Sequence, residues 1–309
     1  SGLDKHVRQL FQELEGRQLE FRPACYLGDE WFSPNGVGAI AIPFYLAHPR
    51  LLQLEQKIML EAEGHDETER MKLLRHECGH AITHAFNLIR RPKWREVFGD
   101  PDHPYEDYYH VRPYSKSYVR HLRNWYAQCH PEEDFAETFA VWLAPDSNWK
   151  QQYRDWPALK KLMYVDVLMR NLGSRTASAP SRLWTSRVDK LKRTLRMHYH
   201  KRRKTYAQEE EGYFDTDLLE IFSKKHDEAT LPAAKFLRKH HNHILQAVGQ
   251  WTHEKKFLVK QILTKLIKRC TLLNLHLNAD SSAVLIHFIS YITAVTSHYH
   301  YTHRYKGRK

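Results

Sequence analysis

The sequence of 309 residues contains no long apolar run. Its longest apolar stretch, Ala283–Val295, is interrupted by polar side chains such as His287 and Ser290. A helix that crosses a bilayer needs about 20 predominantly apolar residues. The sequence therefore predicts a chain without a membrane span.

Cysteine is also scarce. The four cysteines, Cys25, Cys78, Cys129 and Cys270, are scattered, and no two of them form a CxxC pair. This spacing excludes a disulfide framework and a cysteine-based structural zinc knuckle, and it favours a reducing compartment. No positively charged segment followed by an apolar one marks a secretory signal near residue 1. Together these absences predict a cytoplasmic protein.

Acidic residues are depleted in only one half of the chain. The formal net charge is +12, but residues 1–181 hold 23 Lys and Arg against 25 Asp and Glu. Residues 182–309 hold 25 against 11. Between the halves lies GSRTASAPS (Gly173–Ser181), a small and polar segment that is typical of a linker. We therefore expect two domains, residues 1–175 and residues 182–309, joined by a linker at 173–181.

The first domain is expected to be a mostly helical α+β domain with a small sheet. Short strands are expected at Leu19–Tyr26 and Val37–Leu46, separated by turn residues. Val37–Leu46 would supply an edge strand, along which an extended peptide could bind. Helices are expected at Asp4–Glu15, Leu51–Ala62, Glu67–Leu88, Ser115–Tyr126, Pro131–Leu143 and Asn148–Asn171, with an ordered loop at Arg91–Pro113.

The second domain is expected to be all-α and basic. Leu258, Ile262 and Leu266 recur at helical spacing. The run RMHYHKRRKTY at Arg196–Tyr206 combines cations that could contact phosphates with tyrosines that could stack on bases. A solvated basic helix face explains the same run, and no known nucleic-acid reader motif is present. Residues 182–309 are therefore expected to recognise an acidic partner or, alternatively, nucleic acid.

A candidate metal site lies in LRHECGHAITHAF (Leu74–Phe86). His76 and His80 are four residues apart, so on a helix both imidazoles project from one face and could bind one Zn²⁺. Glu77 lies beside them, where a carboxylate could take a proton from a metal-activated water. This HExxH spacing is typical of zinc metallopeptidases, although a polar helix face can carry it by chance. His84, one turn further on, is either a fourth ligand or a neighbour with a structural role.

A second polar pair lies in HPEEDFAETFAVWL (His130–Leu143), on a helix that is otherwise apolar. Glu133 and Glu137 are again four residues apart. Buried carboxylates are costly unless a cation or a donor compensates them. Glu133 as a metal ligand, with Glu137 accepting a hydrogen bond from a ligand imidazole, would compensate both. The alternative is that acids merely favour the start of a helix, which explains Glu132 and Asp134 but not Glu137.

Together the two segments resemble the gluzincins, thermolysin-like zinc peptidases in which HExxH is followed on a later helix by Glu-x-x-x-Asp/Glu. HPEEDFAETFAVWL is also similar to the motif of the bacterial family called putative zinc-binding metallopeptidases, and EDFAETF resembles a stretch of the anthrax lethal factor protease domain. The resemblance covers about residues 20–172 and implies a zincin-like fold. It also implies one Zn²⁺ per chain, held by His76, His80 and Glu133. Asp134 is the rival third ligand.

The same resemblance implies roles for three further residues. Glu77 would be the general base, and Glu137 would orient a ligand imidazole. Tyr126 lies seven residues before Glu133, and its phenol would stabilise a tetrahedral oxyanion. A buried aromatic beside Trp125 is the alternative interpretation of Tyr126.

The sequence therefore predicts a zinc-dependent peptidase that hydrolyses peptide bonds in a peptide or protein, with zinc-activated water and Glu77 as general base. One alternative keeps the protease but directs it to nucleic-acid-bound proteins through residues 182–309. Another alternative is a non-catalytic, zinc-stabilised binding module.

Overall fold

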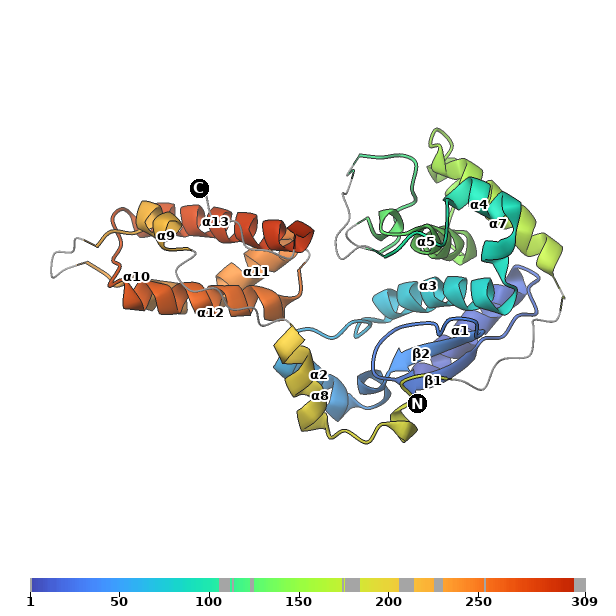
Figure 1. The fold of residues 1–309 in the computed structure, drawn as a ribbon, viewed down its shortest axis with the longest axis horizontal. Coiled ribbons are helices and arrows are strands. Elements are labelled where there is room, and N and C mark those ends of the chain that lie inside the picture. The colour runs from blue at the N-terminus through green and yellow to red at the C-terminus, as the bar shows by residue number, and fades with distance from the viewer. Residues whose placement is uncertain are drawn as a thin grey trace. The chain divides into compact units, whose positions relative to one another are not determined.

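The structure of the chain is a computed structural model, shown in Figure 1. It describes residues 2–105, 112, 114–122, 125–173, 175, 184–205, 214–224, 230–252 and 254–302. The chain forms two compact units: unit 1 comprises residues 1–55 and 62–192, and unit 2 comprises residues 56–61 and 193–309. The expected linker at 173–181 lies mostly outside the described residues, so that domain boundary stays a prediction.

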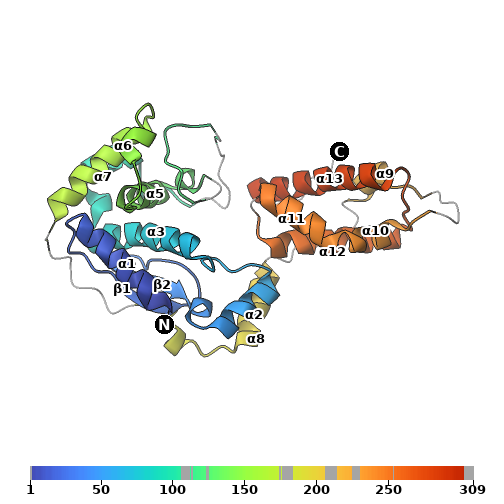
Figure 2. The ribbon, with the colours of Figure 1, turned by 180° about the vertical axis from the view of Figure 1, so that it is seen from behind.

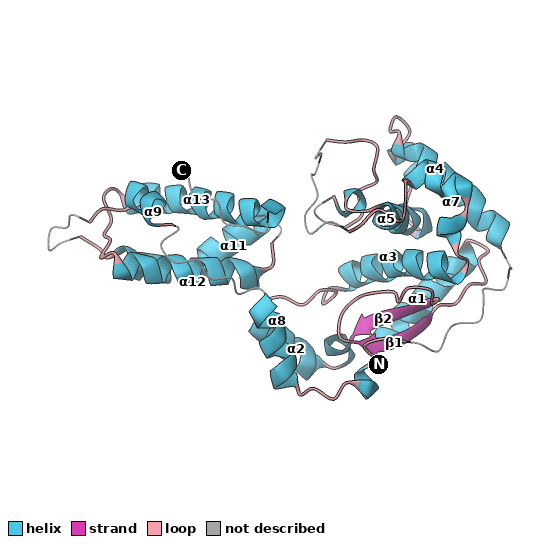
Figure 3. Ribbon diagram, viewed as in Figure 1, coloured by secondary structure: helices cyan, strands magenta, loops and turns pink. Residues whose placement is uncertain are grey.

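Unit 1 combines a two-stranded sheet with helices, as Figure 3 shows. Its strands are β1 (Ala24–Gly28) and β2 (Ala39–Pro43), and its helices are α1 (Gly2–Gly16), most of α2 (Pro49–Met59), α3 (Glu67–Ala85), α4 (Pro92–Phe98), α5 (Pro131–Leu143), α6 (Trp149–Gln152) and α7 (Ala158–Leu172). Short 3₁₀ helices lie at Phe44–Ala47, Leu88–Arg90, Tyr126–Gln128 and Val188–Lys190. This architecture is consistent with the mostly helical α+β fold that the sequence predicts.

The two strands pair in parallel, with Ala24 opposite Ala39 and Gly28 opposite Pro43. Every residue of β2 is buried, as expected of a strand whose two faces are both covered. The Ala41 N–H donates a hydrogen bond to the Phe32 carbonyl at 2.8 Å, in an antiparallel bridge. At Ala41, therefore, Phe32 of the chain itself pairs with β2, the strand along which an extended peptide is expected to bind.

Helix α3 lies between α1 and β2 on one side and α5 on the other (Figure 1). It begins at Glu67 because the Asp66 carboxylate accepts hydrogen bonds from two N–H groups of the first turn, at 2.9 and 3.0 Å. Apolar residues such as Leu74 and Ile82 belong to the core of unit 1. Because both sides of α3 are covered, the polar residues of the HExxH motif must be satisfied inside the protein.

Helix α5 is buried from Glu133 to Leu143 without interruption. Pro131 occupies its first turn, and the His130 imidazole accepts a hydrogen bond from the Glu132 N–H at 3.2 Å, so the helix begins where the sequence predicts. Helix α3 covers one side of α5, and α7 packs against it elsewhere, as the view from behind in Figure 2 shows. Helix α4 also packs against α5. Carboxylates on such a helix need partners from its neighbours.

Three local predictions are wrong. The segment Arg91–Pro113, expected to be a loop, contains helix α4. The single helix expected at Asn148–Asn171 is divided into α6 and α7. The helix expected at Ser115–Tyr126 is absent from the described residues 114–122, which form turns and bends.

The hydrogen bonds of this last segment explain why it is not helical. The Leu122 N–H donates to Oε2 of Glu137 at 2.8 Å, and the Arg120 N–H donates to the Tyr153 hydroxyl at 3.1 Å. These N–H groups bond to side chains of distant elements in place of carbonyls four residues earlier. Tertiary contacts thus override a helical pattern in the sequence.

Unit 2 contains α8 (Leu195–Thr205), α9 (Asp215–Ile221), α10 (Ala233–Lys239), α11 (His241–Thr252), α12 (Lys256–Leu272) and α13 (Ser281–Thr302). Helix α11 packs against α12 and α13, and α10 packs against α12. The stripe Leu258, Ile262 and Leu266 is buried in its apolar core, as predicted. Isolated bridges also join His276 to Ser223 and Pro232.

The all-α character of this half stays a prediction, because residues 206–213 and 225–229 lie outside the described part of the chain. The basic run Arg196–Tyr206 falls on α8, except for Tyr206, which is outside the described residues. In the ranges that the structure describes, no helix has both the length and the apolar character needed to cross a bilayer.

Candidate metal centre

The candidate site depends on a close crossing of α3 and α5. A methyl group at Gly79 of α3 would lie 2.8 Å from Cα of Ala136 and 3.1 Å from its carbonyl oxygen. Side chains do not tolerate such distances to a backbone, so glycine is what allows the two helices to approach this closely. The crossing brings the first turns of α5 next to the histidines of α3.

Three possible ligand atoms converge at this crossing. Nε2 of His76 and Nε2 of His80 are 3.2 Å apart, and each lies 3.1 Å from Oε2 of Glu133. The side chains are only 4, 12 and 7% exposed, respectively. Among the residues that the structure describes, these three form the one group of His, Cys, Asp and Glu side chains with metal-binding geometry.

The three atoms fit a zinc ion. Ligands at roughly 2.0–2.1 Å from a tetrahedral Zn²⁺ lie roughly 3.3 Å from one another, close to the 3.1 and 3.2 Å separations of His76, His80 and Glu133. Two imidazoles and a carboxylate are also ligands that zinc accepts. Without a metal ion or a proton between them, lone pairs of these atoms would face each other. The group could therefore hold a metal ion.

Glu137 lies one turn after Glu133 and holds His76 in place. Nδ1–H of His76 donates to Oε1 of Glu137 at 2.8 Å, and the Leu122 N–H donates to Oε2 at 2.8 Å. Because a carboxylate accepts hydrogen bonds, the proton of a neutral His76 must lie on Nδ1. Nε2 is then left with a lone pair that points toward His80 and Glu133.

The electrostatics of the site favour positive charge. Burial lowers the pKa of His76, but Glu133 and Glu137 outweigh burial and hold the pKa well above its ordinary value. Burial also lowers the pKa of His80, but Glu133 outweighs burial and raises the pKa above its ordinary value. The two histidines in turn lower the pKa of Glu133, although burial acts in the opposite direction. A site that draws protons onto buried imidazoles also attracts a cation.

Glu77 is buried beside the two histidines and differs from the other acids of the site. Its Oε2 atom has no hydrogen-bond partner among the described residues. Burial raises the pKa of Glu77 above its ordinary value. Burial of a carboxylate oxygen without a hydrogen-bond donor is unfavourable. A water molecule or a substrate group that donates a hydrogen bond to this atom would remove that cost.

Two tyrosines lie next to the ligand group. The Tyr126 ring lies 5.6 Å from the His76 ring, measured between centroids, and burial raises the pKa of its phenol. The Tyr105 hydroxyl donates to Oε1 of Glu133 at 3.1 Å. The sequence predicts Tyr126 at this site but not Tyr105, because Tyr105 lies in the expected loop Arg91–Pro113 and belongs to no motif with regular spacing.

The two rival ligands lie outside the group. Oδ2 of Asp134 is 2.5 Å from Nζ of Lys161, on helix α7. Asp134 therefore has a cation of its own, on a different side of α5 from Glu133. Burial lowers the pKa of His84 to about 4, so this imidazole is neutral at physiological pH and is not one of the three converging ligands.

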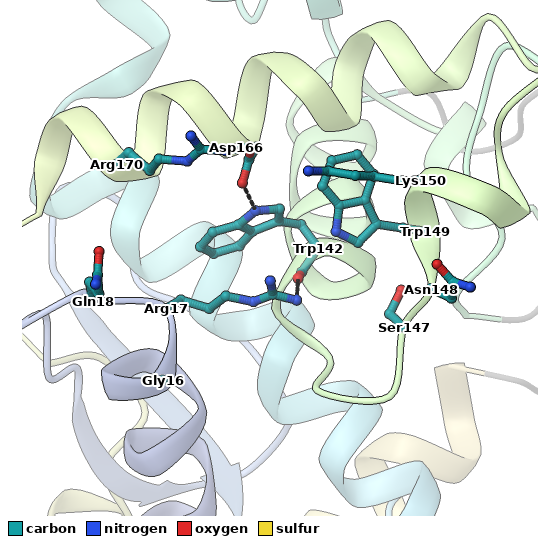
Figure 4. Close-up of a pocket in the computed structure, with 10 residues that line it drawn as sticks. All are labelled: Gly16, Arg17, Gln18, Trp142, Ser147, Asn148, Trp149, Lys150, Asp166 and Arg170. Atoms are coloured by element: carbon teal, nitrogen blue, oxygen red, sulfur yellow. Dashed lines mark hydrogen bonds and ion pairs between the residues drawn. The ribbon is translucent and has the colours of Figure 1, made fainter.

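A pocket of about 420 Å³ lies elsewhere in unit 1 (Figure 4). The Arg17 guanidinium donates to the Trp142 carbonyl at 2.6 Å, and the Trp142 indole N–H donates to Asp166 at 3.0 Å. These polar groups satisfy one another across the pocket. No residue of the candidate metal site lines it.

Residues 66–152 match the model of a family described as "putative zinc-binding metallo-peptidase". The matched range contains the whole of α3 and α5, and with them both histidines of the ligand group and Glu77, Glu133 and Glu137. No curated protein and no solved structure matches the chain. The comparison supports a peptidase role in general.

Proposed function

We propose that this chain is a zinc-dependent peptidase that hydrolyses peptide bonds in peptides or proteins, with one Zn²⁺ held by His76, His80 and Glu133. The observation that carries the proposal is the convergence of three ligand atoms within 3.2 Å of one another. The unpartnered oxygen of Glu77 beside them supports it. The family match over residues 66–152 supports it independently.

The metal and Glu77 have complementary roles in the proposed reaction. When bound, the ion supplies a Lewis acid that polarises water and the substrate carbonyl. Glu77 accepts the proton of the attacking water and later delivers it to the leaving amine. Burial, which raises the pKa of Glu77 above its ordinary value, favours its role as a proton acceptor.

Glu137 and Tyr126 support the proposed reaction but do not transfer the proton of the attacking water. Glu137 keeps the proton of His76 on Nδ1, so that Nε2 remains a ligand. The phenol of Tyr126 stays protonated because burial raises its pKa. Tyr126 therefore donates a hydrogen bond to the oxyanion that develops on the substrate carbonyl.

The direct test is cleavage of a diverse peptide library by the zinc-reconstituted chain. We expect cleavage that stops when a chelator is added and resumes when Zn²⁺ is restored. A chain that holds one zinc but cleaves no peptide in the library would contradict the peptidase proposal while leaving the metal site standing. The alternative functions and the acidic or nucleic-acid partner of residues 182–309 stay predictions, as does the cytoplasmic location.

A further inference from the structure

The two carboxylate oxygens of Glu133 have different neighbours. Oε2 faces the ligand nitrogens of His76 and His80, at 3.1 Å from each. Oε1 points away from them and accepts the hydrogen bond of the Tyr105 hydroxyl at 3.1 Å. One oxygen is therefore directed at the proposed metal position, and the other is held by a phenol.

Tyr105 is itself fixed by the start of the helix that carries Glu133. Its ring stacks on the His130 imidazole, with centroids 3.8 Å apart and planes inclined by 17°. His130 receives the Glu132 N–H on Nδ1 at 3.2 Å, so its own proton lies on Nε2, which donates to the His103 carbonyl at 2.8 Å. The phenol and Glu133 are thus positioned by the same helix end.

The segment that leads to Tyr105 is anchored as well. The Arg95 guanidinium forms ion pairs with Asp100, at 2.6 Å, and with Asp102. Arg95 lies on α4, which packs against α5. Contacts from two helices therefore define where the Tyr105 hydroxyl lies, although 54% of the residue is exposed.

We infer that Tyr105 is a positioning residue that keeps Glu133 as a one-oxygen ligand. Catalytic zinc sites need an open coordination position. If the Tyr105 hydrogen bond were removed, Oε1 of Glu133 would be free to turn toward the metal and occupy that position. The inference rests on the proposed metal site, but it does not depend on peptide cleavage.

This role separates the two tyrosines of the site. Tyr105 acts through Glu133 and should control how the metal is held. Tyr126 lies against the His76 ring and should affect only the reaction. Hydrogen bonds of this supporting kind typically change metal affinity by about 10–100-fold when they are removed.

The experiment compares Tyr105→Phe with Tyr126→Phe and with a matched control, Tyr114→Phe, at a residue that is 91% exposed. Zinc affinity is measured by competition with a chelator, and the coordination of Co²⁺ in the same site is followed by its visible absorption. For Tyr105→Phe we expect an affinity about tenfold lower and a weaker Co²⁺ absorption, because a fifth ligand atom reduces its intensity. The other two variants should bind zinc and Co²⁺ as the unmodified chain does.

The inference is overturned if Tyr105→Phe matches Tyr114→Phe in both affinity and Co²⁺ spectrum. It is also overturned if the unmodified chain binds no metal, since Glu133 then has no ligand role to support. A chain that binds zinc, shows the Tyr105 effect and cleaves no peptide would refute the peptidase proposal alone. Thermal melting of the metal-free variants checks that all three are folded.

Discussion

The two units bury very different side chains. Among the described residues, all buried carboxylates lie in unit 1: Glu55, Glu77, Glu133, Asp134, Glu137 and Asp166. The buried polar residues of unit 2 are histidines and threonines: His198, Thr252, His276 and Thr296. Burial of a carboxylate is unfavourable unless something compensates it. Unit 2 therefore has an ordinary apolar helical core, whereas unit 1 buries carboxylates that need a compensating cation or hydrogen-bond donor.

These buried carboxylates differ in how far their neighbours compensate them. Asp134 has Lys161, and Asp166 has the indole N–H of Trp142. Glu77 retains an oxygen without a donor among the described residues, and Oε2 of Glu133 faces two imidazole nitrogens. Two of these carboxylates, Glu77 and Glu133, thus lie together at the α3–α5 crossing. Buried carboxylates without full compensation are unfavourable for stability, and such groups are expected at functional sites.

The largest effect is expected at Glu77, whose Oε2 atom has no donor among the described residues. Glu77→Gln keeps the shape but removes the base, so peptide cleavage should fall by about 10²–10⁴-fold or more. Zinc affinity and melting temperature should change little. The matched control is Glu67→Gln on the same helix, whose side chain is 67% exposed. Recovery of the Glu77→Gln activity with excess zinc would show that the residue binds metal, contrary to the assigned role.

Much of this candidate site could be predicted from sequence because its candidate ligands follow helical spacing. The pairs at His76 and His80 and at Glu133 and Glu137 are each one turn apart, so local geometry fixes their faces. Tyr105 could not be predicted, because its position depends on stacking against His130 and on a loop held by ion pairs. The spacing of residues in the sequence does not show which distant segments contact each other in the fold.

The fold shows the same limit. Helices α3 and α5 begin where capping residues and Pro131 indicate. The segment Ser115–Tyr126 has a helical pattern, yet Glu137 and Tyr153 take its N–H groups. A glycine at position 79 is compatible with the close approach of another segment, but the sequence could not show that Ala136 is the residue that approaches it.

The next largest effect is expected from zinc on thermal unfolding. A ligand present at about 100 times its Kd stabilises the state that binds it by about 2.7 kcal/mol. Only unit 1 contains the ligand group, so calorimetry of the intact chain should show two transitions, one of which moves to higher temperature with Zn²⁺. A single transition that shifts as a whole would contradict the independence of the two units, and with it the predicted domain division.

Substitution of Glu137 should have a smaller effect, and it should lower zinc affinity, whereas substitution of Glu77 should lower the rate of cleavage. Glu137→Gln removes the carboxylate that orients His76, so zinc affinity should fall by about 10–100-fold. Cleavage should recover at high Zn²⁺, which is the behaviour that separates the two glutamates. The measurement is cleavage rate against zinc concentration. Loss of activity with zinc fully bound would indicate that Glu137 takes part in the reaction itself.

The smallest effects are expected from a pair of glycines, one in each unit. Gly79→Ala places a methyl group 2.8 Å from Cα of Ala136, and overpacking of this kind lowers the free energy of unfolding by about 1–3 kcal/mol. At Gly249 of α11 the nearest atom would lie 3.6 Å away, so Gly249→Ala should raise it by about 0.4–1 kcal/mol. Denaturant melts of both variants test the contrast, and equal effects would mean that α3 and α5 do not cross as closely as the structure indicates.

The central claim is that one Zn²⁺ is bound by His76, His80 and Glu133, and metal content tests it most directly. The zinc bound per chain is measured after reconstitution and gel filtration for the unmodified chain, Glu133→Gln, Asp134→Asn and His84→Gln. We predict one zinc per chain for the unmodified protein and for the last two variants, because Asp134 pairs with Lys161 and His84 lies outside the ligand group. Glu133→Gln should lose most of its zinc while remaining folded. An unmodified chain without zinc, or zinc lost in Asp134→Asn and retained in Glu133→Gln, would contradict the account.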